Sequence, residues 1–224
     1  MGAVLAMMHK FWICLGAATV ALAACGPLNE GSTGAQVLEL AATRIAGAPP
    51  VAASGLAVSQ DEILSSPGKY MRVNISNINR WDTMARAGTN GPRVTWVDGS
   101  NMTLTLENGI IAATRGLPRD LIGANVSETW HAIRAGGGKA RREHEFLTDL
   151  DSISTQLLQC SIAFKGPEVI ERLQNTLNSV RFEEECQGEG LQFTNVYWVN
   201  DAGVILRSLQ AVSPDAGYLQ IDAF

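Results

Sequence analysis

The sequence predicts a mainly β domain, an antiparallel barrel-like or sandwich fold with few short helices, behind an N-terminal export segment. Three observations predict it: short stretches in which apolar and polar residues alternate, turn signals between them, and an apolar run near the N-terminus that ends in a cysteine. Many short alternating strands at close spacing indicate a barrel or sandwich. With 224 residues, 46% of them hydrophobic, the chain is long enough for one domain with a substantial core.

The N-terminal segment has the organisation of a lipoprotein signal peptide. A basic start, Met8-His9-Lys10, precedes an apolar run over residues 11–24 that is too short for a stable membrane span. Its end, Leu22-Ala23-Ala24-Cys25, matches the lipobox, in which small residues admit the signal peptidase and the thiol takes the diacylglycerol. We therefore expect residues 1–24 to be removed and Cys25 to be lipidated. The alternative is an ordinary secreted protein with a cysteine at its cleavage site.

The residue after the lipobox cysteine indicates the membrane. In enteric-type bacteria an aspartate there retains a lipoprotein in the inner membrane, whereas this chain has Gly26. We therefore expect export to the outer membrane, where two or more acyl chains give a stable anchor.

Beyond the cysteine, residues 25–35 are rich in Gly, Pro, Asn and Ser and predict a flexible tether. Apolar residues then recur at helical spacing and predict a short amphipathic helix over residues 36–46. No later run of 18 apolar residues predicts a membrane span, and no linker interrupts the rest. We therefore assign residues 36–224 to a single domain.

The remaining elements are predicted from alternation and turns. Strands are expected at residues 71–75, 93–97, 102–107, 110–114, 142–147, 155–164, 176–183, 195–199 and 204–209. Asn108-Gly109 is a strong hairpin turn signal, and Asn200-Asp201-Ala202-Gly203 marks a second hairpin. Residues 116–122 predict a bend and one helical turn, and residues 167–174 a short helix or loop.

Two cysteines remain once the signal peptide and the lipidation site are set aside. In an oxidising compartment Cys160 and Cys186 are expected to form a disulfide. It would close a loop of about 25 residues, which the chain-entropy model values at roughly 3 kcal/mol. The competing interpretation, a metal site or catalytic thiol, lacks a nearby histidine and zinc-ligand spacing.

Composition and motifs argue against several function classes. The net charge is −5 and no basic stripe predicts nucleic-acid binding; Lys139, Arg141 and Arg142 suggest a solvated glycine-rich loop. No hydrolase, zincin or nucleotide-binding motif occurs. His144 is expected at the surface and His131 as a half-buried structural residue, while residues 183–185 and Asp149 with Asp151 suggest solvated charge clusters. We therefore predict no catalytic residue, no metal and no cofactor besides the covalent lipid on Cys25.

Aromatic residues are the best candidates for ligand contact. Trp81, Trp96, Trp130, Tyr197 and Trp198 are spread over a chain otherwise poor in aromatics, and sugars stack their C–H faces on aromatic rings. Period two places Tyr197 and Trp198 on opposite faces of one strand, so one of them is expected in the core. Our first candidates for contacts with glycan or a protein partner are Trp198, Arg207 and Gln210.

Two separated segments resemble one protein family. The run Leu106 to Leu121 (LENGIIAATRGLPRDL) resembles the central signature of the YjbF-type (GfcB-like) lipoproteins. The tail resembles the second signature through Glu185-Cys186, Phe193 to Asn200 (FTNVYWVN), Gly203 to Gln210 (GVILRSLQ), Ser213-Pro214 and Gly217-Tyr218, with Leu209 where an aromatic residue is expected.

The resemblance implies a role in exopolysaccharide or group 4 capsule production, on a mainly β, barrel-like domain with no established catalytic residues. It also implies an outer-membrane β-barrel and a periplasmic export protein as partners. We expect a non-enzymatic accessory lipoprotein on the periplasmic face of the outer membrane that binds polysaccharide or such a barrel, and no nucleic acid. The alternatives are a polysaccharide-modifying hydrolase and a purely structural envelope lipoprotein.

Overall fold

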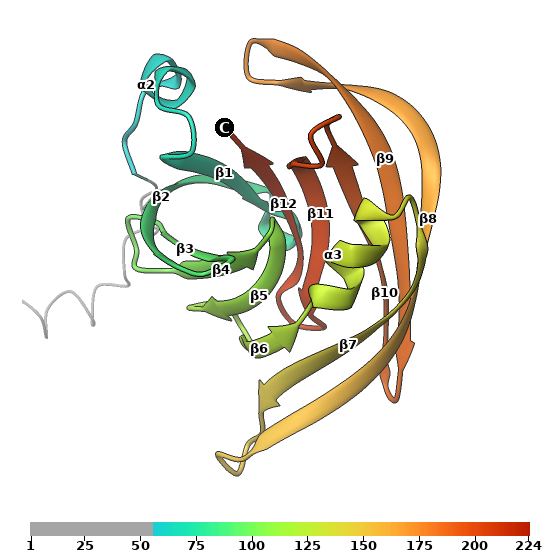
Figure 1. Cartoon of the computed structure of the whole chain (residues 1–224). Helices are drawn as coiled ribbons and strands as arrows, with labels where there is room; N and C mark the ends of the chain where they lie inside the picture. Colours follow the sequence, from blue (N-terminus) through green and yellow to red (C-terminus); the bar gives the residue numbers. More distant parts are fainter. Residues whose placement is uncertain (1–55) are drawn as a thin grey trace, which may run out of the picture. The chain divides into compact units, whose positions relative to one another are not determined.

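The computed structural model describes residues 56–224, which form one antiparallel sheet of 12 strands curled into a nearly closed barrel (Figure 1). The strands are β1 (Tyr70–Ile75), β2 (Arg80–Asn90), β3 (Arg93–Val97), β4 (Thr103–Glu107), β5 (Ile110–Arg115), β6 (Leu121–Asn125), β7 (Gly138–Leu147), β8 (Ile153–Arg172), β9 (Asn175–Gly188), β10 (Leu191–Val199), β11 (Ile205–Ser213) and β12 (Gly217–Ala223). The helical elements are α2 (Gln60–Ser65), η1 (Ser76–Ile78) and α3 (Ser127–Arg134). The expected mainly β class with few short helices is confirmed, in its barrel form.

The strand order is β5-β4-β3-β2-β1-β12-β11-β10-β9-β8-β7-β6. Almost every pair of neighbours in the sheet is also consecutive in the sequence, as hairpin connections require. The exception is β1 with β12, where Val73 lies opposite Ile221 and the two ends of the described chain meet. Both hairpins predicted from turn residues are present, as β4–β5 and β10–β11.

Side chains close the barrel at the seam between β5 and β6, where no strand ladder forms. Arg115 donates from Nη1 to the carbonyl of Leu121 at 3.3 Å and from Nη2 to that of Ile122 at 3.2 Å. The Leu121 N–H donates to Thr114 Oγ1 at 3.0 Å. These contacts satisfy backbone groups that an open sheet edge would leave unpaired.

The core lies inside the barrel, on the face to which alternate residues of each strand point. Its fully buried apolar members include Met71, Val73, Leu104, Ile111, Leu121, Leu158, Tyr197 and Leu219. Helix α3 packs against β7 and β8 and buries Thr129, Ala132 and Ile133 (Figure 1). Within residues 56–224 no helix has the length and apolarity needed to cross a membrane.

The structure corrects three local predictions. Residues 167–172 belong to strand β8 instead of a helix or loop; Pro167 is tolerated because pairing of β8 with β7 ends at Ile162 and leaves an edge. Residues 116–119 form a bend and a turn that no helix continues, and Leu121 and Ile122 belong to β6. The basic cluster Lys139 to Arg142 lies in strand β7 instead of a loop. The predicted signal peptide, Cys25, the tether and the helix over residues 36–46 lie outside the described residues.

Candidate functional site

Two segments that are distant in the sequence meet inside the barrel. The side-chain amide of Gln210 on β11 donates to the carbonyl of Gly109 at 3.0 Å, and its Oε1 accepts from the N–H of Ile111 at 2.9 Å. Gly109 has a positive φ of 86°, and a Cβ there would lie 3.0 Å from the Ile205 Cβ. The β4–β5 turn is therefore held against the start of β11 by a close approach that favours glycine.

A cavity of about 580 Å³ lies beside this junction. Its walls come from the β2–β3 turn, β3, β4, the β4–β5 turn, helix α3, the β10–β11 loop and the ends of β11 and β12: Pro92, Val94, Trp96, Leu106, Asn108, Gly109, Trp130, Arg134, Ala202, Gly203, Val204, Ile205 and Ala223. We call it the tryptophan cavity, after Trp96 and Trp130. Its lining is mostly apolar with a few polar groups, which is typical of small-molecule sites.

Helix α3 contributes the charged group of the tryptophan cavity. Arg134 ends the helix, and its guanidinium carbon lies 5.8 Å from the centre of the Trp130 ring. Its Nη1 donates to the carbonyl of Ala202 at 2.9 Å. The guanidinium occupies the space beside Gly203, where a side chain would collide with it. The β10–β11 loop therefore holds Arg134 in place.

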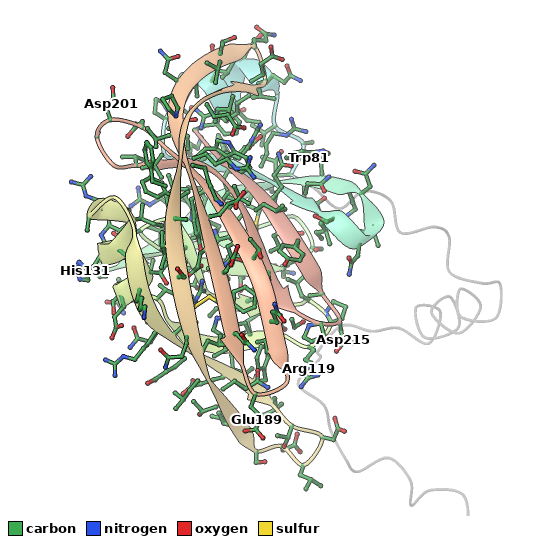
Figure 2. The ribbon with its side chains drawn as sticks, turned by 90° about the vertical axis from the view of Figure 1, so that its right-hand side faces the viewer. Trp81, Arg119, His131, Glu189, Asp201 and Asp215 are labelled. Carbon is green, nitrogen blue, oxygen red and sulfur yellow. A yellow bond between two sulfur atoms is a disulfide. The ribbon has the colours of Figure 1, made fainter. Side chains whose placement is uncertain are left out.

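A second cavity, of about 720 Å³, is more polar and lies at the other end of the barrel. Figure 2 shows Arg119 and Asp215 at that end, and Asp201 of the β10–β11 loop at the opposite one. Arg119 and Asp215 form a wide ion pair of 4.0 Å. Asp120 also lines this cavity, but its carboxylate accepts from Thr114 Oγ1 and from the backbone N–H groups of Gly116 and Leu117. The Asp120 carboxylate therefore stabilises the loop between β5 and β6.

Beneath α3, the barrel interior contains a buried polar network centred on Glu184. Its carboxylate accepts from Arg142 Nη1 at 2.8 Å, Tyr197 OH at 2.7 Å, Asn195 Nδ2 at 2.7 Å and Thr129 Oγ1 at 2.6 Å. Burial alone would raise the pKa of Glu184, but the charge of Arg142 and these hydrogen bonds outweigh it and lower the pKa. The expectation that Glu184 and Arg142 are solvated is wrong, because both point into the barrel.

Both histidines within residues 56–224 lie in surroundings other than those predicted from the sequence. His144, expected at the surface, is 1% exposed and stacks on Phe193 with ring centres 5.5 Å apart. Neither ring nitrogen has a hydrogen-bond partner, and burial, followed by the charge of Arg142, lowers the pKa of His144 to about 3. His131, expected half-buried, is exposed on α3. His144 is thus a neutral core residue with no carboxylate to orient it.

The three predicted contact residues do not form one surface. Trp198 is half-buried, and its register partners are Arg181 on β9 and Arg207 on β11. Arg207 is bound to Asp222 through two hydrogen bonds of 2.6 and 2.9 Å. Gln210 is 1% exposed and forms the internal junction described above. The prediction of Gln210 as a surface contact is wrong. Gln210 lies three residues after Arg207 on β11, so the two side chains point to opposite faces of the sheet.

The predicted disulfide is present between Cys160 on β8 and Cys186 on β9, which are register partners. Together with Glu184, these cysteines form the one group in residues 56–224 with metal-ligand spacing. Because both sulfurs are bonded to each other, the pair acts as a cross-strand link.

Comparison with known proteins decides the family. The family described as "Group 4 capsule polysaccharide lipoprotein gfcB, YjbF" matches residues 37–224. The chain belongs to the YjbF family. This membership links it to capsule polysaccharide production and to membrane-anchored lipoproteins of the cell envelope. Both segments that meet at the tryptophan cavity lie within the YjbF match.

A solved structure shares the YjbF-family barrel. The crystal structure of the hypothetical lipoprotein YmcC from Escherichia coli K12 superposes with a TM-score of 0.64 at 15% identity, covering 87% of this chain and 96% of that chain. At this identity the likeness establishes the fold alone. No curated protein matches the chain significantly.

The sequence only partly indicated the tryptophan cavity. Trp96 and Trp130 belong to the aromatic set noted above, but nothing in the pattern brought them together. Arg134 was missed because α3 was missed: its buried stripe of Thr129, Ala132 and Ile133 is too short and too weakly apolar to be recognised.

Proposed function

We propose that this YjbF-family protein is a non-enzymatic accessory factor in the production or secretion of exopolysaccharide or capsule. It binds a short saccharide segment in the tryptophan cavity and presents it to an outer-membrane barrel or an export protein. The observation that carries the proposal is the meeting of Trp96, Trp130 and Arg134 in one cavity. Aromatic faces supply contact area for sugar C–H groups, and the guanidinium supplies fixed hydrogen-bond donors.

The state of the ionisable core groups supports a binding role over hydrolysis. A glycosidase needs two carboxylates that face each other across a cleft. The tryptophan cavity has no carboxylate among its described lining residues. Glu184 is enclosed by four donors, and His144 stacks on a phenylalanine.

The lipobox supports a location at the outer membrane. In this proposal Cys25 is the lipidated N-terminus and holds the protein on the periplasmic face of the outer membrane. Two or more acyl chains make such an anchor stable. The residue after it, Gly26, lacks the carboxylate that retains lipoproteins in the inner membrane.

Complementation of a deletion strain tests the proposal. We expect deletion to reduce surface polysaccharide, the unaltered gene to restore it, and Trp130→Ala to fail. Trp81→Ala is the matched control, since Trp81 lies on β2 outside the cavity, with Arg72 over its ring at 4.7 Å. In parallel, the full-length protein should bind fragments of the strain's polysaccharide without shortening them. Unchanged polysaccharide after deletion, or cleavage of the fragments by the purified protein, contradicts the proposal.

A further inference from the structure

We infer that the tryptophan cavity selects a carboxylate-bearing sugar, with Arg134 as the residue that recognises the acid group. This inference rests on the proposed function, because it names the class of saccharide that the same cavity takes. Arg134 is the one charged side chain among the described residues that line the cavity. A ligand carboxylate in this cavity would contact the guanidinium of Arg134 and no acidic side chain among the lining residues.

The guanidinium of Arg134 is pre-organised for such a contact. One of its nitrogens is fixed by the Ala202 carbonyl at 2.9 Å, and its plane is supported by Trp130 and by the bare backbone at Gly203. Holding a charged side chain before the ligand arrives removes part of the ordering cost of binding. The remaining N–H donors form the fork that matches a carboxylate.

The rest of the lining also favours a sugar, which combines acceptor oxygens with apolar C–H faces. Trp96 is 8% exposed and its indole nitrogen is buried, so it offers the cavity apolar ring surface. Asn108, whose side chain carries an amide, also lines the cavity. A sugar ring carries hydroxyl and ring oxygens that accept from such groups, together with C–H faces that suit the two tryptophans. A fatty acid supplies an anion but few further acceptors.

The cavity at the other end of the barrel provides a contrast within the same molecule. Its lining includes Arg119 but also Asp120, Asp149 and Asp215, so an anionic ligand would meet net negative charge there. Electrostatic complementarity of this kind determines specificity more than affinity. The acid group is therefore expected at the tryptophan cavity.

Calorimetric titration with two forms of one polymer tests the inference. Fragments of the strain's own polysaccharide are used as isolated and after chemical reduction of their carboxyl groups to alcohols, with the full-length protein in detergent. We expect the acidic fragments to bind at least about tenfold more tightly than the reduced ones, the effect of one charge-assisted contact. Arg134→Gln should remove that difference, whereas Arg134→Lys should keep part of it.

A matched control is Arg141→Gln, because Arg141 is exposed and paired with Glu128 outside the cavity. It should leave both affinities unchanged, and thermal unfolding of each variant verifies folding. Equal binding of the two fragment forms, or a polymer without carboxylate, overturns the inference and leaves the proposed function standing. Binding of neither form contradicts the proposed function itself. Arg134-dependent binding of palmitate in place of the fragments would identify a lipid anion and overturn the inference.

Discussion

The amide of Gln210 reaches the carbonyl of Gly109 across a sequence distance of 101 residues and joins the two segments that resemble the YjbF-family signatures. The same side chain accepts from the N–H of Ile111 on β5, the strand at the seam. Gln210 thus satisfies these two backbone groups, and it holds Gly109, which lines the tryptophan cavity.

Replacing Gln210 should therefore destabilise the barrel. Gln210→Ala leaves the buried N–H of Ile111 without an acceptor and removes side-chain volume, at a cost of about 2–4 kcal/mol. Urea unfolding followed by circular dichroism measures the free energy. Gln192→Ala, at an exposed position on β10, should change it by less than about 0.5 kcal/mol. Equal stability of the two variants would show that the junction is dispensable.

The position of Arg134 should depend on Gly203. Gly203 has a positive φ of 81°, and a Cβ there would collide with the guanidinium of Arg134. We expect Gly203→Ala to lower stability by about 1–3 kcal/mol and to weaken saccharide binding by displacing Arg134. Gly88→Ala is the control, because a Cβ at Gly88 meets nothing within 4 Å. Unfolding and titration of both variants check this, and wild-type affinity in Gly203→Ala would refute the link.

The Glu184 network should be essential for folding. Glu184→Gln leaves the guanidinium of Arg142 buried without a countercharge, which typically costs about 3–5 kcal/mol. The neighbouring Glu185→Gln is exposed and should be nearly neutral. Comparison of their denaturation midpoints is decisive. If Glu184→Gln is as stable as Glu185→Gln, the buried ion pair contributes nothing to the barrel.

His144 should make the protein sensitive to acid. Burial lowers its pKa from 6.5, the ordinary value of a histidine, to about 3 in the folded protein, so below pH 6.5 the unfolded chain binds a proton that the folded chain does not. The contribution of neutral His144 to the free energy of unfolding should be fully present above about pH 6.5. It should be lost as the pH falls towards 3, by up to about 1.4 kcal/mol per pH unit. His144→Phe, which keeps an aromatic ring against Phe193, should remove this loss.

The comparison is made between pH 7 and pH 5. We expect the wild type to lose about 2 kcal/mol more than His144→Phe over this interval. His131→Gln, on the exposed face of α3, should retain the wild-type pH dependence. An identical pH dependence in the wild type and His144→Phe would mean that another group controls acid unfolding.

Local features of the fold were predictable because they depend on neighbouring residues. The alternation of apolar and polar residues, with the turn residues Asn108-Gly109 and Asn200 to Gly203, predicted both hairpins that border the tryptophan cavity. Cysteine count and compartment predicted the link between Cys160 and Cys186. The opposite placement of Tyr197 and Trp198 followed from period two, and Tyr197 is the one in the core.

Other features required the closed barrel. Period two states which residues share a face of a strand, but it does not state which face is the core when both carry polar groups. For that reason His144 was expected at the surface, and only the curvature of the sheet turned it inward together with Arg142 and Glu184. The sequence alone thus determined most of the strands, two hairpins and the family signatures, but not β2, β6 and β12. The tertiary structure decided the tryptophan cavity, because Trp96, Trp130 and Arg134 come from segments that only barrel closure and the docking of α3 bring together.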